Sequence, residues 1–198
     1  MDRQVMRVLQ SRLFWAVNLP VDVKRKLVNL QSYLRTAQAN VKWVEQHNLH
    51  LTVKFLGDVA DSRISEIVRN VNEAAAGTGV FTLTLSGLGF FPGSRRPRII
   101  WVGVQDELHK FRLLHKRVEE CMAVLGWASD SQSFAPHLTL GRLRTPRDGQ
   151  VLVSKADKLC GDLGIIGDIT VSGIDLMKSE LTRKGPVYQV LASVQLNT

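Results

Sequence analysis

The same tetrapeptide pattern, histidine-leucine-threonine followed by an aliphatic residue, occurs twice in this chain, at His50–Val53 and at His137–Leu140. Both copies lie in short apolar runs that are typical of β-strands. Side chains alternate between the two faces of a strand, so each copy places its histidine and threonine on one face and its two aliphatic residues on the other. The chain must therefore build two strands that each have an apolar back and a face carrying an imidazole beside a hydroxyl.

The segments around the two copies also repeat. In each half, a strand and an amphipathic helix precede the motif strand, and a helix and a further strand follow it. With no low-complexity linker between them, the 198 residues predict one large domain or two closely packed lobes, and the repeat favours a duplicated α+β unit whose halves face each other. The expected strands are Arg12–Leu19, Lys42–Val44, His50–Leu56, Phe81–Leu88, Arg98–Val104, His137–Leu143, Ile169–Ser179 and Val187–Gln195. The expected helices are Val21–Ala37, a helix capped by Asp61 or Ser62 that ends near Gly77, Glu107–Leu125 and Val151–Leu163.

The charge of the chain narrows the class of ligand. A net charge of +8 and a pI near 9.9 favour polyanionic partners, nucleic acid first, although many basic proteins use such a charge only to stay soluble. No apolar run approaches the roughly twenty residues that a membrane span requires. The charged first residues, Met1–Ser11, lack the apolar block of a signal peptide. We therefore expect a cytoplasmic protein without a membrane partner.

Two histidines that face one substrate suit general acid–base catalysis. If the halves meet about a pseudo-two-fold axis, His50 and His137 converge, and one neutral imidazole can remove a proton while one imidazolium donates a proton to a leaving oxygen. An unperturbed pKa near 6.5 allows both forms at neutral pH. A single such motif is most often an ordinary half-buried histidine. Two copies in matching halves coincide by chance roughly once in a few thousand sequences, so we interpret the repeat as functional.

The neighbours of the histidines fit a phosphate ligand. The hydroxyls of Thr52 and Thr139 can donate hydrogen bonds to phosphate oxygens. Lys54 follows Thr52 with the spacing of the same strand face, and Arg142 lies just past the second motif. The chain has no HExxH motif, no CxxC pair and no other cluster with metal-ligand spacing. These residues predict phosphodiester chemistry without a metal or another cofactor.

The paired motifs identify a family resemblance. The chain resembles the 2H phosphoesterase superfamily, which is defined by paired H-x-T-x motifs, and within it the bacterial and archaeal RNA 2′,3′-cyclic phosphodiesterases, formerly called 2′-5′ RNA ligases. The resemblance covers Arg12 to about Val190, almost the whole chain. It extends to the phrases RLFWAVNLP, LHLTVKFLGDV, GLGFFPGSRRPRIIWVGV, PHLTLGRLR and LMKSELTRKGPVYQV.

The resemblance implies an α+β fold in one domain, residues 1–198, with two pseudo-symmetric lobes of antiparallel sheet and outer helices around a central cleft. It also implies metal-independent hydrolysis of RNA 2′,3′-cyclic phosphate ends to 2′-phosphate ends. His50 would be the proton donor to the departing 3′ oxygen and His137 the proton acceptor from water. Thr52 and Thr139 would hold the phosphate.

The substrate contacts implied by the resemblance are Arg142 and Phe14, both toward the terminal nucleotide, and Lys54 completes the expected substrate-binding set. The expected substrate is RNA with 2′,3′-cyclic phosphate ends, tRNA fragments among them, and the expected state is a monomer. Two alternatives stay open. The same site can serve 2′-5′ ligation of tRNA halves, or the chain can be an RNA-end binding module whose histidines recognise phosphate without turnover. Intact histidine and threonine in both motifs argue against the binding module, because arginine would serve pure binding better.

Overall fold

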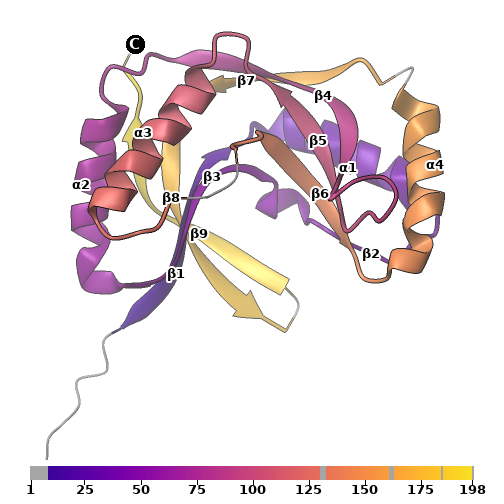
Figure 1. Cartoon of the computed structure of the whole chain (residues 1–198), viewed down its shortest axis with the longest axis horizontal. Coiled ribbons are helices and arrows are strands. Elements are labelled where there is room, and N and C mark those ends of the chain that lie inside the picture. Colours follow the sequence, from indigo (N-terminus) through magenta and orange to yellow (C-terminus); the bar gives the residue numbers. More distant parts are fainter. Residues whose placement is uncertain (1–8, 130–132, 161–162, 184, 198) are drawn as a thin grey trace, which may run out of the picture.

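Two antiparallel sheets form the centre of the computed structural model, which describes residues 9–129, 133–160, 163–183 and 185–197 (Figure 1). Sheet A joins, in spatial order, β3 (His50–Ala60), β1 (Gln10–Asn18), β8 (Gly173–Thr182) and β9 (Gly185–Gln195), and sheet B joins β2 (Val41–Trp43), β6 (His137–Leu143), β5 (Ile99–Gln105), β4 (Phe81–Phe91) and β7 (Ile165–Val171). The two copies of the repeated motif thus lie on different sheets, the first on β3 and the second on β6. The α+β fold with two lobes of antiparallel sheet is confirmed.

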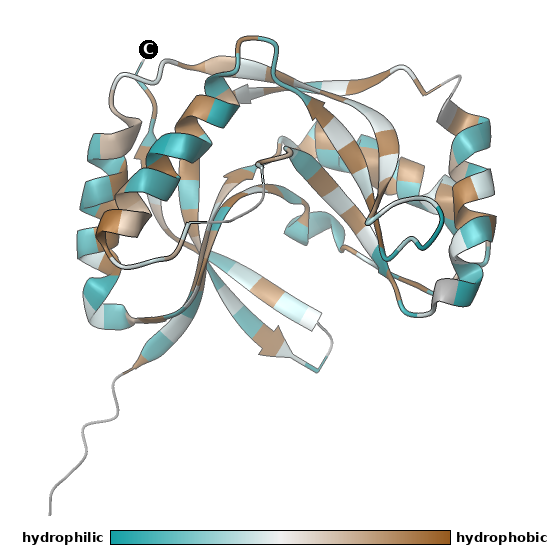
Figure 2. Cartoon of the chain, in the orientation of Figure 1, coloured by the Kyte–Doolittle hydropathy of each residue, from teal (hydrophilic) through white to brown (hydrophobic). Residues whose placement is uncertain are grey.

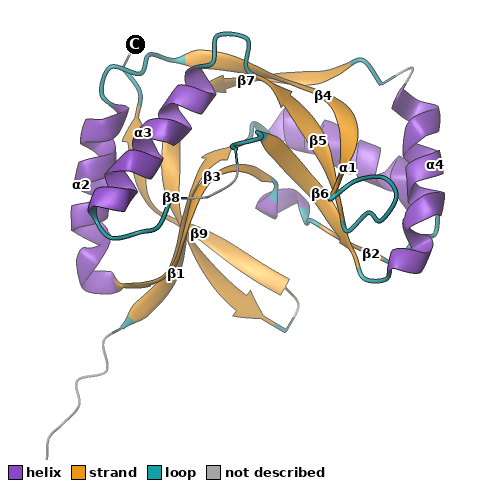
Figure 3. Ribbon diagram, viewed as in Figure 1, coloured by secondary structure: helices purple, strands orange, loops and turns teal. Residues whose placement is uncertain are grey.

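Each sheet carries helices on the side turned away from the other sheet (Figure 3). Helices α2 (Ile64–Ala75) and α3 (Lys110–Val124) cover sheet A, and helices α1 (Val21–Arg35) and α4 (Gly149–Cys160) cover sheet B. The helices form because their apolar residues recur at intervals of three and four, which places them on one face. The opposite faces are hydrophilic (Figure 2). We call the helix-free face of each sheet its inner face.

The two lobes do not correspond to the two halves of the sequence. The first half keeps β1, β3 and α2 in the lobe of sheet A but contributes α1, β2 and β4 to sheet B. The second half keeps β5, β6, β7 and α4 with sheet B but contributes α3, β8 and β9 to sheet A. Each of the two lobes is therefore built from elements of both halves of the sequence. Each half places its first helix and two strands in the other lobe.

A single hydrophobic core runs behind both inner faces. On β1 the alternation is complete: Leu13, Trp15 and Val17 belong to this core, whereas Phe14 and Ala16 lie on the inner face with a small apolar cluster of their own. The same core contains the leucines of both motif strands and the apolar faces of all four described helices. Because burial of this apolar surface is the main favourable term in folding, it also fixes which face of each strand points inward.

Most expected boundaries differ from the structure by a few residues, and two of the differences change the course of a strand. Strand β3 continues through Gly57, which adopts a φ of +72° at a register shift opposite Leu13 and Phe14, so this glycine marks a β-bulge and not the end of the strand. The expected strand Ile169–Ser179 is two strands, because the chain leaves sheet B after β7 and enters sheet A as β8. The expected helix Val151–Leu163 is observed as α4, and residues 161–162 lie outside the described part of the chain. No helix among the described residues is long and apolar enough to span a bilayer.

The crossing from β7 to β8 depends on a glycine. Gly173 pairs with Gln195 at the start of β8, and a Cβ added there would lie 2.6 Å from the carbonyl oxygen of Val194. A side chain at this position would push β8 away from β9. The close approach of the two backbones therefore requires glycine.

Replacing Gly173 by alanine should lower the free energy of unfolding by about 1–3 kcal/mol, the usual cost of forcing an extra group into a packed site. Gly93 is the matched control, since a Cβ added there meets nothing within 4 Å. Gly93→Ala should leave stability unchanged or raise it by about 0.4–1 kcal/mol through the unfolded chain. Urea denaturation of the three proteins measures both effects. Equal stability of the two variants would contradict the close approach at Gly173.

Candidate active site

The first motif lies on β3 and presents its polar residues on the inner face of sheet A. His50 and Thr52 are partly exposed there, whereas Leu51 and Val53, 1% and 3% exposed, belong to the core. In the register with β1, His50 lies opposite Asn18. The apolar back of the strand thus fixes the direction of the imidazole and the hydroxyl, as the alternation predicts.

Both nitrogens of His50 have partners. Its Nδ1 lies 2.7 Å from the carbonyl oxygen of Asn48, and its Nε2 lies 3.1 Å from Oγ1 of Thr52. A carbonyl oxygen only accepts, so the hydrogen-bond network assigns the Nδ1 proton to this bond. In the neutral ring Nε2 accepts from the threonine hydroxyl, and in the imidazolium it donates. Nε2 is therefore the nitrogen that can exchange a proton with a ligand.

The second motif repeats this arrangement on β6. Leu138 and Leu140 are fully buried, and His137 and Thr139 lie on the inner face of sheet B. The Nδ1 of His137 lies 2.8 Å from the carbonyl oxygen of Ala135, two residues earlier, as in the first motif. The same donor assignment leaves Nε2 of His137 as the exchangeable nitrogen. The likeness of the two motifs thus extends to the tautomer of each ring.

Aromatic rings hold both imidazoles from the side. The His50 ring lies 5.0 Å from the Phe14 ring and 5.4 Å from the Tyr188 ring, measured between centroids, and the Tyr188 contact is edge-to-face. The His137 ring meets Phe91 edge-to-face at 4.8 Å and lies 6.2 Å from Trp101. Such contacts restrict ring rotation without occupying a nitrogen.

Burial disfavours the charged form of His50. Desolvation lowers the pKa of His50 below its ordinary value of 6.5, and the positive charge of Lys24 lowers it further. The hydrogen bond to the Asn48 carbonyl opposes these two effects but does not cancel them. In the unliganded protein at neutral pH the His50 ring is therefore mostly neutral. A negative charge bound nearby would raise the pKa again.

A β-bulge follows each motif at the same position. Thr52 pairs with Ala16 and Lys54 with Trp15, so Val53 is an extra residue in β3. Thr139 pairs with Trp101 in the same way, Gly141 pairs with Ile100, and the extra residue of β6 is Leu140. An extra residue reverses the alternation beyond it. Residues four places after each histidine therefore turn away from the inner face, and residues five places after it turn toward it.

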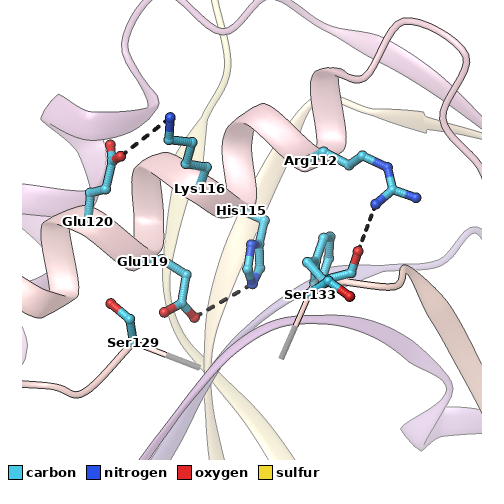
Figure 4. Close-up of a pocket in the computed structure, with 8 residues that line it drawn as sticks. Arg112, His115, Lys116, Glu119, Glu120, Ser129 and Ser133 are labelled. Atoms are coloured by element: carbon cyan, nitrogen blue, oxygen red, sulfur yellow. Dashed lines mark hydrogen bonds and ion pairs between the residues drawn. The ribbon is translucent and has the colours of Figure 1, made fainter. Parts of the chain in front are cut away.

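The first bulge overturns the expected role of Lys54. This lysine is 3% exposed and points into the core side of sheet A, where its Nζ donates to Glu119 at 2.8 Å and to the carbonyl oxygen of Ala128 at 2.9 Å. Glu119 also lies 3.6 Å from Nε2 of His115 (Figure 4). Lys54 thus joins β3 to α3 behind the inner face. The prediction that it shares a face with Thr52 and binds substrate is wrong.

Phe14 is placed on the inner face as expected but is covered. It is 3% exposed, beneath the rings of His50 and Tyr188, so its surface supports the histidine and is not free for a nucleotide. Phe55, which the bulge turns inward, lies opposite Phe14 with ring centroids 5.8 Å apart and is 65% exposed. Simple alternation assigned Phe55 to the core, which is why the sequence did not indicate it.

The second bulge places Arg142 on the inner face of sheet B. Arg142 is exposed and lies opposite Ile99, which in turn pairs with Phe91, the aromatic neighbour of His137. Burial raises the pKa of Tyr188, and the charges of Arg142 and Arg12 act in the opposite direction. Arg142 therefore lies close enough to Tyr188 of sheet A to influence it. Together with the contact between β3 and β6, this interaction shows that the two motif strands lie close to each other.

Polar residues that the sequence did not indicate lie beside His50. The amide nitrogen of Asn18, opposite His50, donates to Asp175 at 2.7 Å, and the hydroxyl of Ser193 also donates to this carboxylate. A polar residue at the end of the apolar run RLFWAVN was the only signal for Asn18. These bonds fix the orientation of the Asn18 amide next to the imidazole.

The remaining polar clusters are separate from the motifs. Among the described residues, no group of three or more His, Cys, Asp or Glu side chains is arranged to hold a metal ion. A shallow pocket of about 390 Å³ borders α3 and the segment after it. Its lining residues are Arg112, His115, Lys116, Glu119, Glu120, Ser129, Ser133 and Phe134 (Figure 4). It contains neither motif histidine, so we place the candidate active site on the inner faces and not in this pocket.

Each sheet presents a histidine and a threonine on its inner face. This geometry agrees with the protein family that the sequence matches. The family of LigT-like phosphoesterases matches residues 17–101 and, a second time, residues 102–188. The chain belongs to this family, and the double match confirms that its two halves are related. The resemblance to the 2H phosphoesterases that the paired motifs indicated is confirmed.

Individual relatives within this family share one activity. The chain is 34% identical over 182 residues to the RNA 2′,3′-cyclic phosphodiesterase of Methanothermobacter thermautotrophicus, covering 91% of this chain and 96% of that protein. It is 33% identical over 194 residues to the RNA 2′,3′-cyclic phosphodiesterase of Thermus thermophilus, covering 93% and 90%. A crystal structure from Thermus thermophilus, that of the protein TT0787, superimposes with a TM-score of 0.74 at 29% identity, covering 93% of this chain and 97% of that one.

Lys54→Met tests the corrected role of this residue. Removing one partner of a buried ion pair should lower the free energy of unfolding by about 3–5 kcal/mol, because the Glu119 carboxylate stays buried. Lys116→Met is the matched control on the same helix as Glu119: the Lys116–Glu120 pair is 71% and 64% exposed, and its loss should change stability by at most about 1 kcal/mol. Denaturant unfolding measures both. A stable Lys54→Met protein with a raised KM would restore Lys54 as a substrate contact.

The protonation of His50 can be followed directly by NMR titration. In the free protein the pKa of His50 should lie below 6.5, because desolvation dominates. Saturation with 2′-AMP should raise this pKa, since the phosphate adds negative charge beside Nε2. The spectrum of His50→Ala identifies the resonance. A pKa above 6.5 in the free protein, or no change with 2′-AMP, would contradict this electrostatic account.

Proposed function

We propose that this chain is an RNA 2′,3′-cyclic phosphodiesterase that hydrolyses 2′,3′-cyclic phosphate ends to 2′-phosphomonoesters. The observation that carries the proposal is the matched pair of histidines, each fixed by an Nδ1 bond to the carbonyl two residues earlier and each with Nε2 toward the inner faces. The names of the relatives support the substrate class. The basic charge of the chain supports a nucleic-acid ligand.

In this proposal water attacks the cyclic phosphorus in line with the 3′ oxygen. Nε2 of neutral His137 takes a proton from the water as the new P–O bond forms. Protonated Nε2 of His50 gives a proton to the 3′ oxygen as the P–O3′ bond breaks. The products are a 2′-phosphomonoester and a 3′ hydroxyl, and one proton returns from His137 to His50 through solvent before the next turnover. The two roles together constitute general acid–base catalysis.

The lowered pKa of His50 makes the proton donor dependent on substrate. The free ring is mostly neutral, yet the proposed donor must be charged. The anionic cyclic phosphate supplies the compensating charge, because an opposite charge within hydrogen-bonding distance favours the imidazolium. Substrate binding and proton uptake by His50 are therefore coupled. The donor becomes competent only where a phosphate occupies the site.

The threonines and Arg142 orient the phosphate in the same proposal. Once Nε2 of His50 is protonated, it no longer accepts from the Thr52 hydroxyl, which lies 3.1 Å away. This hydroxyl is then free to donate to a phosphate oxygen, and Thr139 does the same from the other sheet. Arg142, on the inner face beyond Thr139, adds a positive charge toward the RNA. We assign the threonines to phosphate binding and Arg142 to the nucleotide.

The biological setting is part of the proposal. We infer a single domain over residues 1–198 that acts as a monomer, because both lobes share one core and one chain supplies both motifs. The proposed ligands are RNA fragments such as cleaved tRNAs, whose ends can carry cyclic phosphate. A cytoplasmic location agrees with such a substrate.

Single substitutions test the proposal. His50→Ala and His137→Ala should each lower kcat on a 2′,3′-cyclic nucleotide by about 10²–10⁴-fold in the presence of EDTA, since each removes one proton-transfer group. Thermal unfolding of both variants checks the fold. Near-wild-type activity in either folded variant would exclude that histidine from catalysis. Tight binding of cyclic-phosphate RNA by the unmodified protein without any turnover would instead establish the binding module.

A substrate with a better 3′ leaving group separates the two roles. Such a group departs without a proton, so it should restore much of the rate of His50→Ala and little of the rate of His137→Ala. The ratio of rates on the two substrates, measured for each variant, gives the answer. Rescue of His137→Ala alone would mean that the roles are reversed.

A further inference from the structure

Two cations lie side by side where the inner face of sheet B reaches its edge. Lys42 of β2 and Arg142 of β6 are direct partners in the antiparallel register, and both are exposed. β2 is the edge strand of this sheet. Directly opposed residues on neighbouring strands have Cβ atoms about 4.5–5.5 Å apart, so one small anion can contact both.

The orientation of Lys42 follows from its neighbours. Val41 and Trp43 pack against the core, and a Cβ added at Gly141 would lie 2.6 Å from a methyl carbon of Val41 and 3.1 Å from the ring of Trp43. Arg35 of α1 lies over the same Trp43 ring, on the helix-covered side. Because side chains alternate, Lys42 points to the inner face, the face that also carries Arg142 and the second motif.

Neither cation is paired with a carboxylate within the part of the protein that the structure describes. The ion pairs among the described residues involve neither Lys42 nor Arg142. The nearby carboxylate of Asp148 is engaged by the backbone N–H of Asn40 and the hydroxyl of Thr145. Like charges directly opposite each other destabilise a sheet. Such a pair is stabilised when an anion lies between its members.

We propose that Lys42 and Arg142 form a subsite for the RNA phosphodiester upstream of the cyclic end. The inference rests on the proposed function, because the cyclic phosphate itself occupies the two motifs. Arg142 lies three residues beyond Thr139, at most about 10 Å along β6, and Lys42 lies about 5 Å further out across the sheet. Lys42 is therefore too far out for the reacting phosphate and is placed for the next unit of the polymer.

In this proposal the two inner faces bind different parts of the RNA. Sheet A offers the exposed ring of Phe55 at the position where sheet B offers Arg142, since the two residues follow their bulges at equal distance. An aromatic ring suits a base and paired cations suit a phosphate. The backbone of the RNA leaves the site over β2, and Lys42 makes the enzyme favour a polymer over a mononucleotide.

Two substrates with the same terminal nucleoside test this subsite: cytidine 2′,3′-cyclic phosphate, which has no upstream phosphate, and a pentanucleotide that ends in the same cyclic group. The readout is the ratio of kcat/KM on the pentanucleotide to kcat/KM on the mononucleotide. Lys42→Gln should lower this ratio about fivefold, as expected for one exposed charge contact, and Lys42→Arg should preserve it. Lys158→Gln, an exposed lysine on α4 behind the sheet, is the matched control and should leave the ratio unchanged.

Salt dependence provides a second readout of the same contact. The slope of log kcat/KM against log salt on the pentanucleotide should become shallower by about 0.7 in Lys42→Gln, the value for one lost contact to a single strand. An unchanged ratio and slope, or an equal loss on both substrates, would overturn the subsite. If the unmodified protein hydrolyses neither substrate, the proposed function fails. The affinities of the two 2′-phosphate products, compared by competition against a labelled pentanucleotide, then still decide whether Lys42 selects the polymer.

Discussion

The alternation of side chains on two strands is the constraint on which the rest of this structure depends. A strand that buries leucines on one face must present the residues between them on the other, and here those residues are histidine and threonine. A one-residue slip would bury the polar face and expose the apolar one, so the core holds the register strongly. Stability and site geometry are thus set by the same leucines. The Nδ1 bond to a carbonyl then fixes each ring within that frame.

The sequence was sufficient to predict the features that depend on the local pattern of apolar and polar residues. The helices, both motif strands and the inward direction of His50 and His137 follow from periodicity. Lys54 and Phe55 could not be placed this way, because the bulge at Val53 arises from the pairing of β3 with β1 and leaves no mark in the motif itself. The division of Ile169–Ser179 into two strands has the same origin, since the partners of β7 and β8 lie on different sheets.

Near-identity of the two motifs does not make the two histidines equivalent. The first lies among Phe14, Tyr188 and the buried side of sheet A, in a setting that disfavours its charge. His137 lies beside Phe91 and Trp101. The indole ring of Trp101 packs against Gly89, where a side chain would leave no room for it. A duplicated unit thus acquired unlike surroundings on its two sides. For His50 to act as the acid in the proposed reaction, the bound phosphate must offset the surroundings that disfavour its charge.

Because each half of the sequence contributes to both lobes, the lobes are not built to move as separate bodies. Hinge closure requires two bodies joined by a few flexible positions, but here helices and strands of each half are built into both lobes, around one continuous core. Within the described chain, the lobes have no hinge line about which to rotate as separate bodies. The separation of the two imidazoles is therefore preset during folding and not during binding. Such an enzyme binds its ligand in a preformed site. The substrate must therefore adapt its conformation to the site, as an unpaired RNA end can.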